Sequence, residues 1–181
     1  MNTPRLVWHF EHQPVESKLT TCVDTDFAGC VVTRRSTSGG VILRGGHLLK
    51  HWSSTQTTVA LSSAEAELGG ICRGASHGIG MRSLMQDLGF KWDLELWSDA
   101  SAAIGICKRR GLGKVRHLAV ADLWVQDHVR TGDFKLAKVL GADNPADIFT
   151  KKVDCPCLGK HLAKMNLRAE TGRAASAPAL E

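Results

Sequence analysis

Four acidic side chains lie in four separate segments of the chain, each beside a short apolar run and each where a strand is expected to end or a helix to begin. They are Asp24, Glu67, Asp99 and Asp147. Carboxylates gathered from distant segments repel one another unless a cation lies between them, and hard divalent cations such as Mg²⁺ take oxygen ligands. Two such ions about 4 Å apart can hold the attacking and leaving oxygens of a phosphodiester. The four acids therefore suggest a metal-dependent nuclease with two Mg²⁺ ions, or Mn²⁺ in their place.

Two of the acids follow predicted strands. Residues 19–23 contain β-favouring Thr and Val and lead into Asp24, and residues 94–98 carry apolar side chains at alternate positions and lead into Asp99. Ligands of α/β sheets usually bind at the carboxyl ends of the strands. Both aspartates therefore stand where a ligand site is expected, although a helix cap or a turn also explains any one such Asp taken alone.

The segment around residue 65 offers two glutamates, and helix geometry separates their roles. Ser62 and Glu65 have the spacing of a capping box, in which the serine caps the helix and the glutamate lies three residues on. Glu67 lies two residues further, about 200° round the helix, and shares a face with Ala64 and Ile71. We therefore expect Glu67 to point toward the sheet as the site residue, and Glu65 to point toward solvent.

The fourth acid, Asp147, lies at a predicted helix start. Asn144 followed by Pro145 is typical of an N-cap with proline at the first helical position. In the first turn the helix dipole favours a negative charge by about 0.3–1 kcal/mol, which by itself explains an Asp here. A predicted strand at residues 134–140 would bring this turn to the same edge of the sheet as the other acids.

Several motifs, taken together and in order, resemble the ribonuclease H domain of copia-type retrotransposon polyproteins. They are residues 23–29, 34–40, 58–67, 98–104, 116–118 and 146–151, within a stretch from about residue 20 to 152. The resemblance implies an α/β ribonuclease H-like fold, with a mixed five-stranded sheet and helices on both faces. It also implies a catalytic metal site in which Asp24 is shared by both ions and Glu67, Asp99 and Asp147 complete the ligand set.

The function implied by this resemblance is hydrolysis of the RNA strand of an RNA–DNA hybrid during reverse transcription. The expected partners are the hybrid and the reverse transcriptase domain of the same polyprotein. Two alternatives stay open: an integrase-like strand transferase, and a catalytically decayed module that binds nucleic acid or packs against a polymerase. The presence of all four acids argues against decay. Five glycines in the predicted helix after Glu67 argue mildly for it, because each helical Gly costs about 0.5–1 kcal/mol relative to Ala.

Basic residues suggest where a polyanion would bind. The net charge is +5 and the pI is near 9.0, which fits a nucleic-acid partner. One group follows the helix expected after Asp99, and a second follows the first strand. The candidate phosphate-binding residues are Lys108, Arg109, Arg110, Lys114, Arg116, Arg34 and Arg35. Cations at a helix C-terminus are also favoured by the dipole, which explains residues 108–110 without nucleic acid. His117 is a candidate for proton transfer or product release beside the site.

The chain is expected to contain one domain with flanking segments. Residues 1–18 are assigned to the end of an upstream reverse transcriptase region or linker, 19–153 to the ribonuclease H domain, and 154–181 to a largely disordered extension with a loop at 155–157. Within the domain we expect a hairpin at residues 41–52 with a Gly-Gly turn. Helices are expected at 63–88, ended by Gly89, and at 117–130.

Composition limits the possible locations of the protein. No apolar stretch approaches the ~18 residues of a membrane span, and the N-terminus has no secretory pattern. The six cysteines are scattered, mostly within apolar segments, which is typical of reduced thiols rather than a disulfide framework. The sequence therefore favours an intracellular protein that is neither secreted nor membrane-bound.

Overall fold

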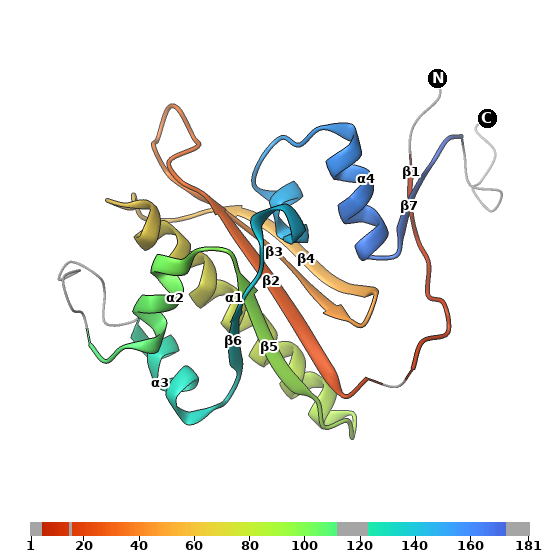
Figure 1. Cartoon of the computed structure of the whole chain (residues 1–181), viewed down its shortest axis with the longest axis horizontal. Coiled ribbons are helices and arrows are strands. Elements are labelled where there is room, and N and C mark those ends of the chain that lie inside the picture. Colours follow the sequence, from red (N-terminus) through yellow and green to blue (C-terminus); the bar gives the residue numbers. More distant parts are fainter. Residues whose placement is uncertain (1–4, 15, 112–122, 173–181) are drawn as a thin grey trace, which may run out of the picture.

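A computed structural model of the chain describes residues 5–14, 16–111 and 123–172. Its centre is a five-stranded mixed sheet with the order β4-β3-β2-β5-β6 (Figure 1). Strand β2 pairs antiparallel with β3 and parallel with β5, and β5 pairs parallel with β6. The strands are β2 (Lys18–Asp26), β3 (Thr37–Arg44), β4 (His47–Thr55), β5 (Asp93–Ser98) and β6 (Lys135–Lys138). The predicted hairpin is confirmed, because β3 and β4 are joined by a turn in which Gly45 has a φ of +56°.

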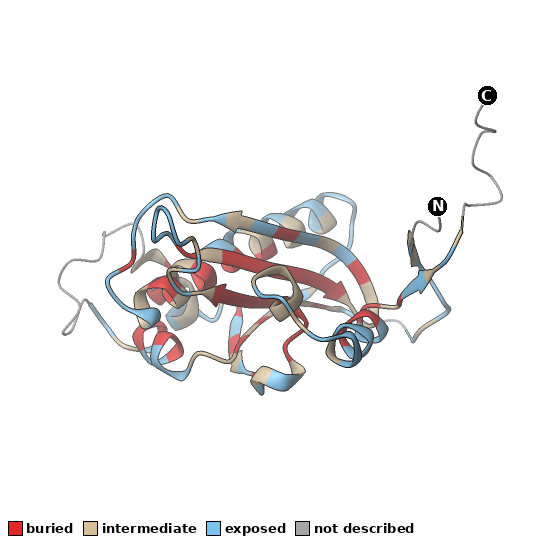
Figure 2. Cartoon of the chain, turned by 90° about the horizontal axis from the view of Figure 1, so that it is seen from above, coloured by how far each residue is buried: buried red, intermediate tan, exposed pale blue. Residues whose placement is uncertain are grey.

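Helices cover both faces of this sheet. Because successive side chains of a strand point to opposite faces, Val23 and Ile42 join one core with helices α1 (Ser63–Asp87), α2 (Ser101–Lys108) and α3 (Trp124–Thr131). Their neighbours Cys22 and Val41 join a second core with the short 3₁₀ helix η3 (Pro145–Phe149) and helix α4 (Cys155–Lys164). Figure 2 shows the buried residues along the central strands and the inner sides of the helices. This confirms the predicted mixed five-stranded sheet with helices on both faces.

Helix α1 lies close to strand β2 because three of its glycines face that strand. A Cβ atom added to Gly70 would lie 2.3 Å from Thr25 Oγ1, and one added to Gly74 would lie 2.3 Å from Val23 Cγ1. A Cβ atom added to Gly78 would lie 2.8 Å from Thr21 Oγ1. The sequence pattern suggested only that glycines weaken this helix. In the folded protein these three allow a close approach of helix and strand, whereas Gly80 has no atom within 4 Å of an added Cβ. The helix ends as predicted, with Gly89 at a φ of +88°.

The two ends of the described chain are paired. Strand β1 (Arg5–Trp8) forms an antiparallel ribbon with β7 (Leu167–Glu170). Helix α4 lies where the sequence suggested a loop at residues 155–157 and an extension without regular structure. Asp154 caps this helix by accepting a hydrogen bond from Cys157 N at 2.9 Å, and the helix buries Leu162 against the sheet. Residues 173–181 lie outside the described residues, and the boundaries proposed at 18 and 153 stay predictions.

The second predicted helix, residues 117–130, is only partly described. Helix α3 covers Trp124–Thr131 and ends at Gly132, which has a φ of +74°. The expected N-terminal part of this helix lies outside the described residues, as do Lys114, Arg116 and His117. In the parts of the chain that the structure describes, no helix has both the length and the hydrophobicity that crossing a bilayer requires.

Candidate metal centre

Two of the predicted site residues meet because their strands are parallel neighbours. Strand β2 pairs with β5 so that Cys22 lies opposite Trp97. Continuing this register by two residues places Asp24 beside Asp99, which immediately follows β5. Asp24 is almost completely buried, with 2% of its surface exposed. Both aspartates therefore lie at one edge of the sheet, as expected from the sequence.

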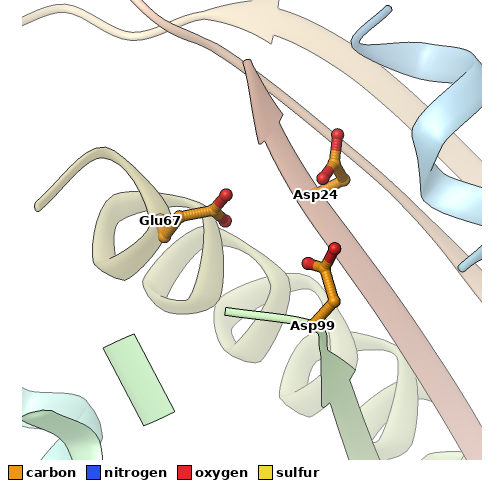
Figure 3. A group of neighbouring side chains, drawn as sticks. All are labelled: Asp24, Glu67 and Asp99. Carbon is orange, nitrogen blue, oxygen red and sulfur yellow. The ribbon is translucent and has the colours of Figure 1, made fainter. Parts of the chain in front are cut away.

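Glu67 completes a group of three carboxylates from three different elements. One oxygen from each of Asp24, Glu67 and Asp99 lies within 4.8 Å of the others. Figure 3 shows the three side chains pointing toward a common space between β2, β5 and α1. Glu67 lies in the first turns of α1, one turn before Gly70, where the helix approaches Thr25 most closely. The close contact between helix and strand therefore places Glu67 near Asp24.

The electrostatics of the group favour a bound cation. Burial, together with the nearby carboxylates of Asp24 and Asp99, raises the pKa of Glu67 to about 8. Burial and the Asp24 carboxylate also raise the pKa of Asp99. Glu67 Oε2 is buried without a hydrogen-bond partner among the described groups, and such orphaned acceptors are uncommon in folded proteins. Carboxylate oxygens are the ligands that Mg²⁺ and Mn²⁺ take, so the residues present fit a divalent ion.

Asp147 lies beside this group rather than within it. It belongs to η3, where Asn144 caps the helix as predicted by accepting from Ala146 N at 3.1 Å. The buried amide of Asn144 also donates to Val23 O at 2.8 Å, which ties η3 to strand β2 one residue before Asp24. Burial, followed by the Asp24 carboxylate, raises the pKa of Asp147. The structure thus brings Asp147 close to Asp24 at the same edge of the sheet, on the face covered by η3, whereas Glu67 approaches from the face covered by α1.

Two residues that follow Asp147 contact the site and were not singled out from the sequence. The Lys151 ammonium lies 3.5 Å from Asp24 Oδ1 and 3.4 Å from Asp147 Oδ2. The Thr150 hydroxyl donates a hydrogen bond to the Asp24 carboxylate. The available sequence signal was the four-residue spacing of Asp147 and Lys151, which is typical of ion pairs on a helix. That spacing does not show that the ammonium also reaches Asp24.

Solved ribonuclease H structures share this architecture. LC11-RNase H1, isolated from compost by a metagenomic approach, superimposes with a TM-score of 0.54 at 16% identity, over 74% of this chain and 93% of that one. The N-terminal RNase H domain of a Mycobacterium tuberculosis protein gives a TM-score of 0.50 at 16% identity, over 74% and 90% of the two chains. The chain has the ribonuclease H fold.

Sequence relatives of this ribonuclease H-fold chain are polyproteins of plant transposons. It is 29% identical over 132 residues, 72% of its length, to the retrovirus-related Pol polyprotein from transposon TNT 1-94 of Nicotiana tabacum. It is 27% identical over 131 residues to that from transposon RE1 of Arabidopsis thaliana. These matches cover 10% and 9% of the relatives, so the chain spans about a tenth of their length. No protein-family model matches. The predicted relationship to retrotransposon Pol polyproteins is confirmed, and the narrower copia assignment stays a prediction.

Within this ribonuclease H fold, the two glutamates of α1 have the separate positions expected of them. Ser62 Oγ accepts a hydrogen bond from Glu65 N at 3.2 Å, which confirms the predicted cap. In return, Glu65 Oε2 accepts from Leu61 N at 2.7 Å. The usual capping box returns this bond to the cap residue itself, so the reciprocal bond is shifted by one residue. Glu65 thus supports the start of the helix, and Glu67 faces the other acids.

The basic candidates that the structure describes form two groups, one at the end of α2 and one in the turn after β2. Lys108 ends α2, and Arg109 and Arg110 follow it along a cleft of about 430 Å³ between the end of α2 and α3. Helix α2 begins two residues after Asp99, and its eight residues span about 12 Å. Arg34 and Arg35 are exposed in the turn that follows strand β2. One group thus ends the helix that begins after Asp99, and the other lies in the turn after the strand that carries Asp24.

Proposed function

We propose that this chain is a divalent-metal-dependent ribonuclease that hydrolyses the RNA strand of RNA–DNA hybrids, as a domain of a retrotransposon Pol polyprotein. The fold alone does not carry this proposal, because one fold can host unrelated functions. The decisive observation is the convergence of Asp24, Glu67 and Asp99 within 4.8 Å from a central strand, a helix and a strand end. Three carboxylates at this separation, one with a buried and unpartnered oxygen, form a ligand set for a hard cation.

In this proposal some residues of the site are metal ligands, and others position those ligands. Asp24, Glu67 and Asp99 would bind an ion, and Asp147 would supply a further ligand on the Asp24 side. A divalent ion bound there supplies an activated nucleophile at neutral pH and neutralises charge on the phosphate. Thr150 fixes the Asp24 carboxylate through its hydroxyl, and Asn144 fixes η3 to β2. Groups that are held in place before the substrate arrives need little reorganisation during reaction.

The substrate proposal comes from the relatives and from the positive charge. LC11-RNase H1 has been solved in complex with an RNA/DNA hybrid, with a TM-score of 0.51 to this chain at 14% identity. A Pol polyprotein context would supply such hybrids together with the reverse transcriptase domain as a neighbour. The basic residues at 34–35 and 108–110 would bind the phosphates of both strands, which fixes the register of a duplex without reading its sequence.

A cleavage assay on the full chain tests the proposal. A hybrid with labelled RNA is incubated with Mg²⁺, with Mn²⁺ and with EDTA, alongside double-stranded DNA and double-stranded RNA of the same sequence. We expect metal-dependent cleavage of the RNA in the hybrid only. The activity should be lost in Glu67→Gln and kept in the matched control Glu65→Gln, which lies on the same helix and changes the charge equally.

Each other outcome has a definite meaning. Folded protein that binds the hybrid without cutting it contradicts the proposal and supports the decayed module. Equal cleavage of double-stranded DNA contradicts the substrate assignment and favours a strand-transferase-like activity. Cleavage that persists in Glu67→Gln shows that the activity does not come from this site.

A further inference from the structure

The Asp24–Asp147 side of the site already holds a positive charge that belongs to the chain itself. Lys151 Nζ lies nearly equidistant from the two carboxylates, at 3.5 Å from Asp24 Oδ1 and 3.4 Å from Asp147 Oδ2. The main chain of Lys151 belongs to the same turn as Asp147, because Lys151 N donates to Asp147 O at 3.0 Å and so closes the turn between the two residues. The turn that positions Asp147 therefore also places the Lys151 side chain within reach of both carboxylates.

On the opposite side of the site, the described residues form no such ion pair. Among the described residues, no basic side chain lies within ion-pair distance of Glu67 or Asp99, while both Asp24 and Asp147 have one. Glu67 Oε2 remains buried and unpartnered. The group of three acids that offers a metal site includes Glu67 and Asp99 but not Asp147. The ion pairing of the site is therefore asymmetric: Lys151 pairs directly with Asp24 and Asp147, whereas its charge acts on Glu67 and Asp99 only from a greater distance.

We propose that Lys151 is a resident cation that occupies the Asp24–Asp147 side, so that a second divalent ion binds there only when the ammonium moves away. The first ion would bind between Asp24, Glu67 and Asp99 without displacing any charged group. This inference deepens the proposed function by naming the residue that controls the second ion. It depends on that function only for its effect on cleavage, because ion binding can be measured without nucleic acid.

The ammonium is able to leave its position. The Lys151 side chain is 46% exposed, and it is a flexible four-carbon stem with a strongly hydrated end. A divalent ion held by Asp24 and Asp147 would lie within a few ångströms of Nζ, at which distance like charges repel strongly in a partly buried site. The ammonium and a second ion therefore compete for the same oxygens.

Counting bound Mn²⁺ ions by electron paramagnetic resonance, on the full chain without nucleic acid, tests the inference. Four proteins are compared: wild type, Lys151→Met, Lys151→Arg, and Lys152→Met. Lys152 is the matched control, because it is the exposed neighbour of Lys151 and its replacement removes the same charge. In the wild type we expect one tightly bound ion and a second that is much weaker. In Lys151→Met the second ion should tighten roughly tenfold or more, and Lys151→Arg should stay near wild type.

The control separates a local effect from a general one. If both ions tighten in Lys151→Met by the same factor as in Lys152→Met, the effect is a change in overall charge and the inference is wrong. An unchanged second ion in Lys151→Met overturns it as well. Circular dichroism in EDTA checks folding, and Lys151→Gln, which keeps a hydrogen-bonding end, repeats the measurement if the Met variant unfolds.

Parallel cleavage assays distinguish failure of this inference from failure of the proposed function. A selective change in the second ion, with no hybrid cleavage by any variant, supports the role of Lys151 and contradicts the nuclease. Metal-dependent cleavage of the hybrid, together with an unchanged affinity for the second ion in Lys151→Met, supports the nuclease and contradicts the role of Lys151.

Discussion

Gly74 of helix α1 lies so close to Val23 of strand β2 that a Cβ on the glycine would be 2.3 Å from Val23 Cγ1. Asp24 is the next residue of the strand, and Glu67 lies about two turns before Gly74 on the helix. The contact between Gly74 and Val23 therefore sets the distance between the backbone segments that carry Asp24 and Glu67. This contact leaves no room for a side chain at position 74. The spacing of the candidate metal ligands thus depends on a glycine.

Replacing Gly74 by Ala should therefore destabilise the protein, although Ala is the better helix former. We expect a loss of about 1–3 kcal/mol in the free energy of unfolding, because an inserted methyl group overpacks the contact with Val23. Helix α1 would move outward and Mn²⁺ binding would weaken. Urea denaturation and Mn²⁺ titration measure the two effects.

The matched control is Gly80→Ala on the same helix, where no atom lies within 4 Å of an added Cβ. This change should stabilise the protein by about 0.5–1 kcal/mol through helix propensity alone. If both substitutions stabilise equally, the close approach at Gly74 does not restrict the helix.

The placement of Asp24 and Asp99 could be predicted from sequence, because β-favouring residues at 19–23 and alternating apolar residues at 94–98 indicate where β2 and β5 run. Helical periodicity likewise separated Glu67 from Glu65. The role of Gly74 could not be predicted, since propensity counts a helical glycine only as a cost and the strand that faces it belongs to the tertiary structure. The position of the Lys151 ammonium between two carboxylates has the same origin, because Asp24 is distant in sequence.

The pairing of β1 with β7 was beyond sequence reasoning for a different reason. The two strands have four residues each and are separated by almost the whole chain, with Arg5 opposite Glu170. No turn connects them directly, so no local signal fixes their register. Helix α4 was missed because a short segment with two cysteines and a proline resembles a loop, although Asp154 followed by Pro156 is also a helix-start signal.

The raised pKa of Glu67 predicts how metal-free stability depends on pH. The ordinary value is 4.5 and the folded value is about 8, so across this interval the folded protein holds a proton that the unfolded chain has released. The free energy of unfolding should therefore fall as pH rises through this interval. Urea denaturation in EDTA between about pH 5 and about pH 8 should show this decline, and it should be shallower in Glu67→Gln.

In saturating Mg²⁺, the contribution of Glu67 to the pH dependence of the free energy of unfolding should change sign. The ion requires the deprotonated carboxylate, so its affinity and the stabilisation that it provides grow as pH rises. An equal pH dependence in EDTA for wild type and Glu67→Gln would contradict the assignment of the raised pKa to this side chain. Glu65→Gln serves as the control, because Glu65 caps the helix away from the acids.

Asn144 should have a larger effect than an ordinary helix cap. Asn144→Ala removes the cap of η3 and also leaves the buried Val23 carbonyl without its amide donor. Loss of both should lower the free energy of unfolding by about 2–4 kcal/mol, since a lost cap costs about 1 kcal/mol and an unsatisfied buried acceptor about 1–3 kcal/mol. Mn²⁺ affinity should also fall, because η3 carries Asp147.

Asp154→Ala is the comparison for this prediction. Asp154 caps α4 through a single exposed bond, so we expect a loss of about 0.5–2 kcal/mol and unchanged Mn²⁺ affinity. Equal stability losses in the two variants, with no change in metal binding in either, would show that Asn144 acts only as a cap.

The basic residues at the end of α2 should determine hybrid affinity without affecting chemistry. Replacing Lys108, Arg109 and Arg110 by Ala should weaken binding equally for hybrids of any sequence, because we expect these cations to bind phosphates rather than bases. The slope of log affinity against log salt should become shallower by roughly 0.7–0.9 for each phosphate that the variant no longer neutralises. Fluorescence anisotropy at several salt concentrations measures this slope, and cleavage at saturating hybrid should be retained.

Two further variants show whether the effect is specific to the end of α2. Lys91→Ala removes an exposed cation beyond the C-terminus of α1 and should leave the slope unchanged. If the triple variant also leaves it unchanged, residues 108–110 serve only the helix C-terminus, where the dipole favours cations. The double substitution Arg34→Ala with Arg35→Ala then tests the remaining basic group. These two side chains are exposed in the turn after β2, so a shallower slope in that variant alone would assign phosphate binding to the turn that follows the strand carrying Asp24.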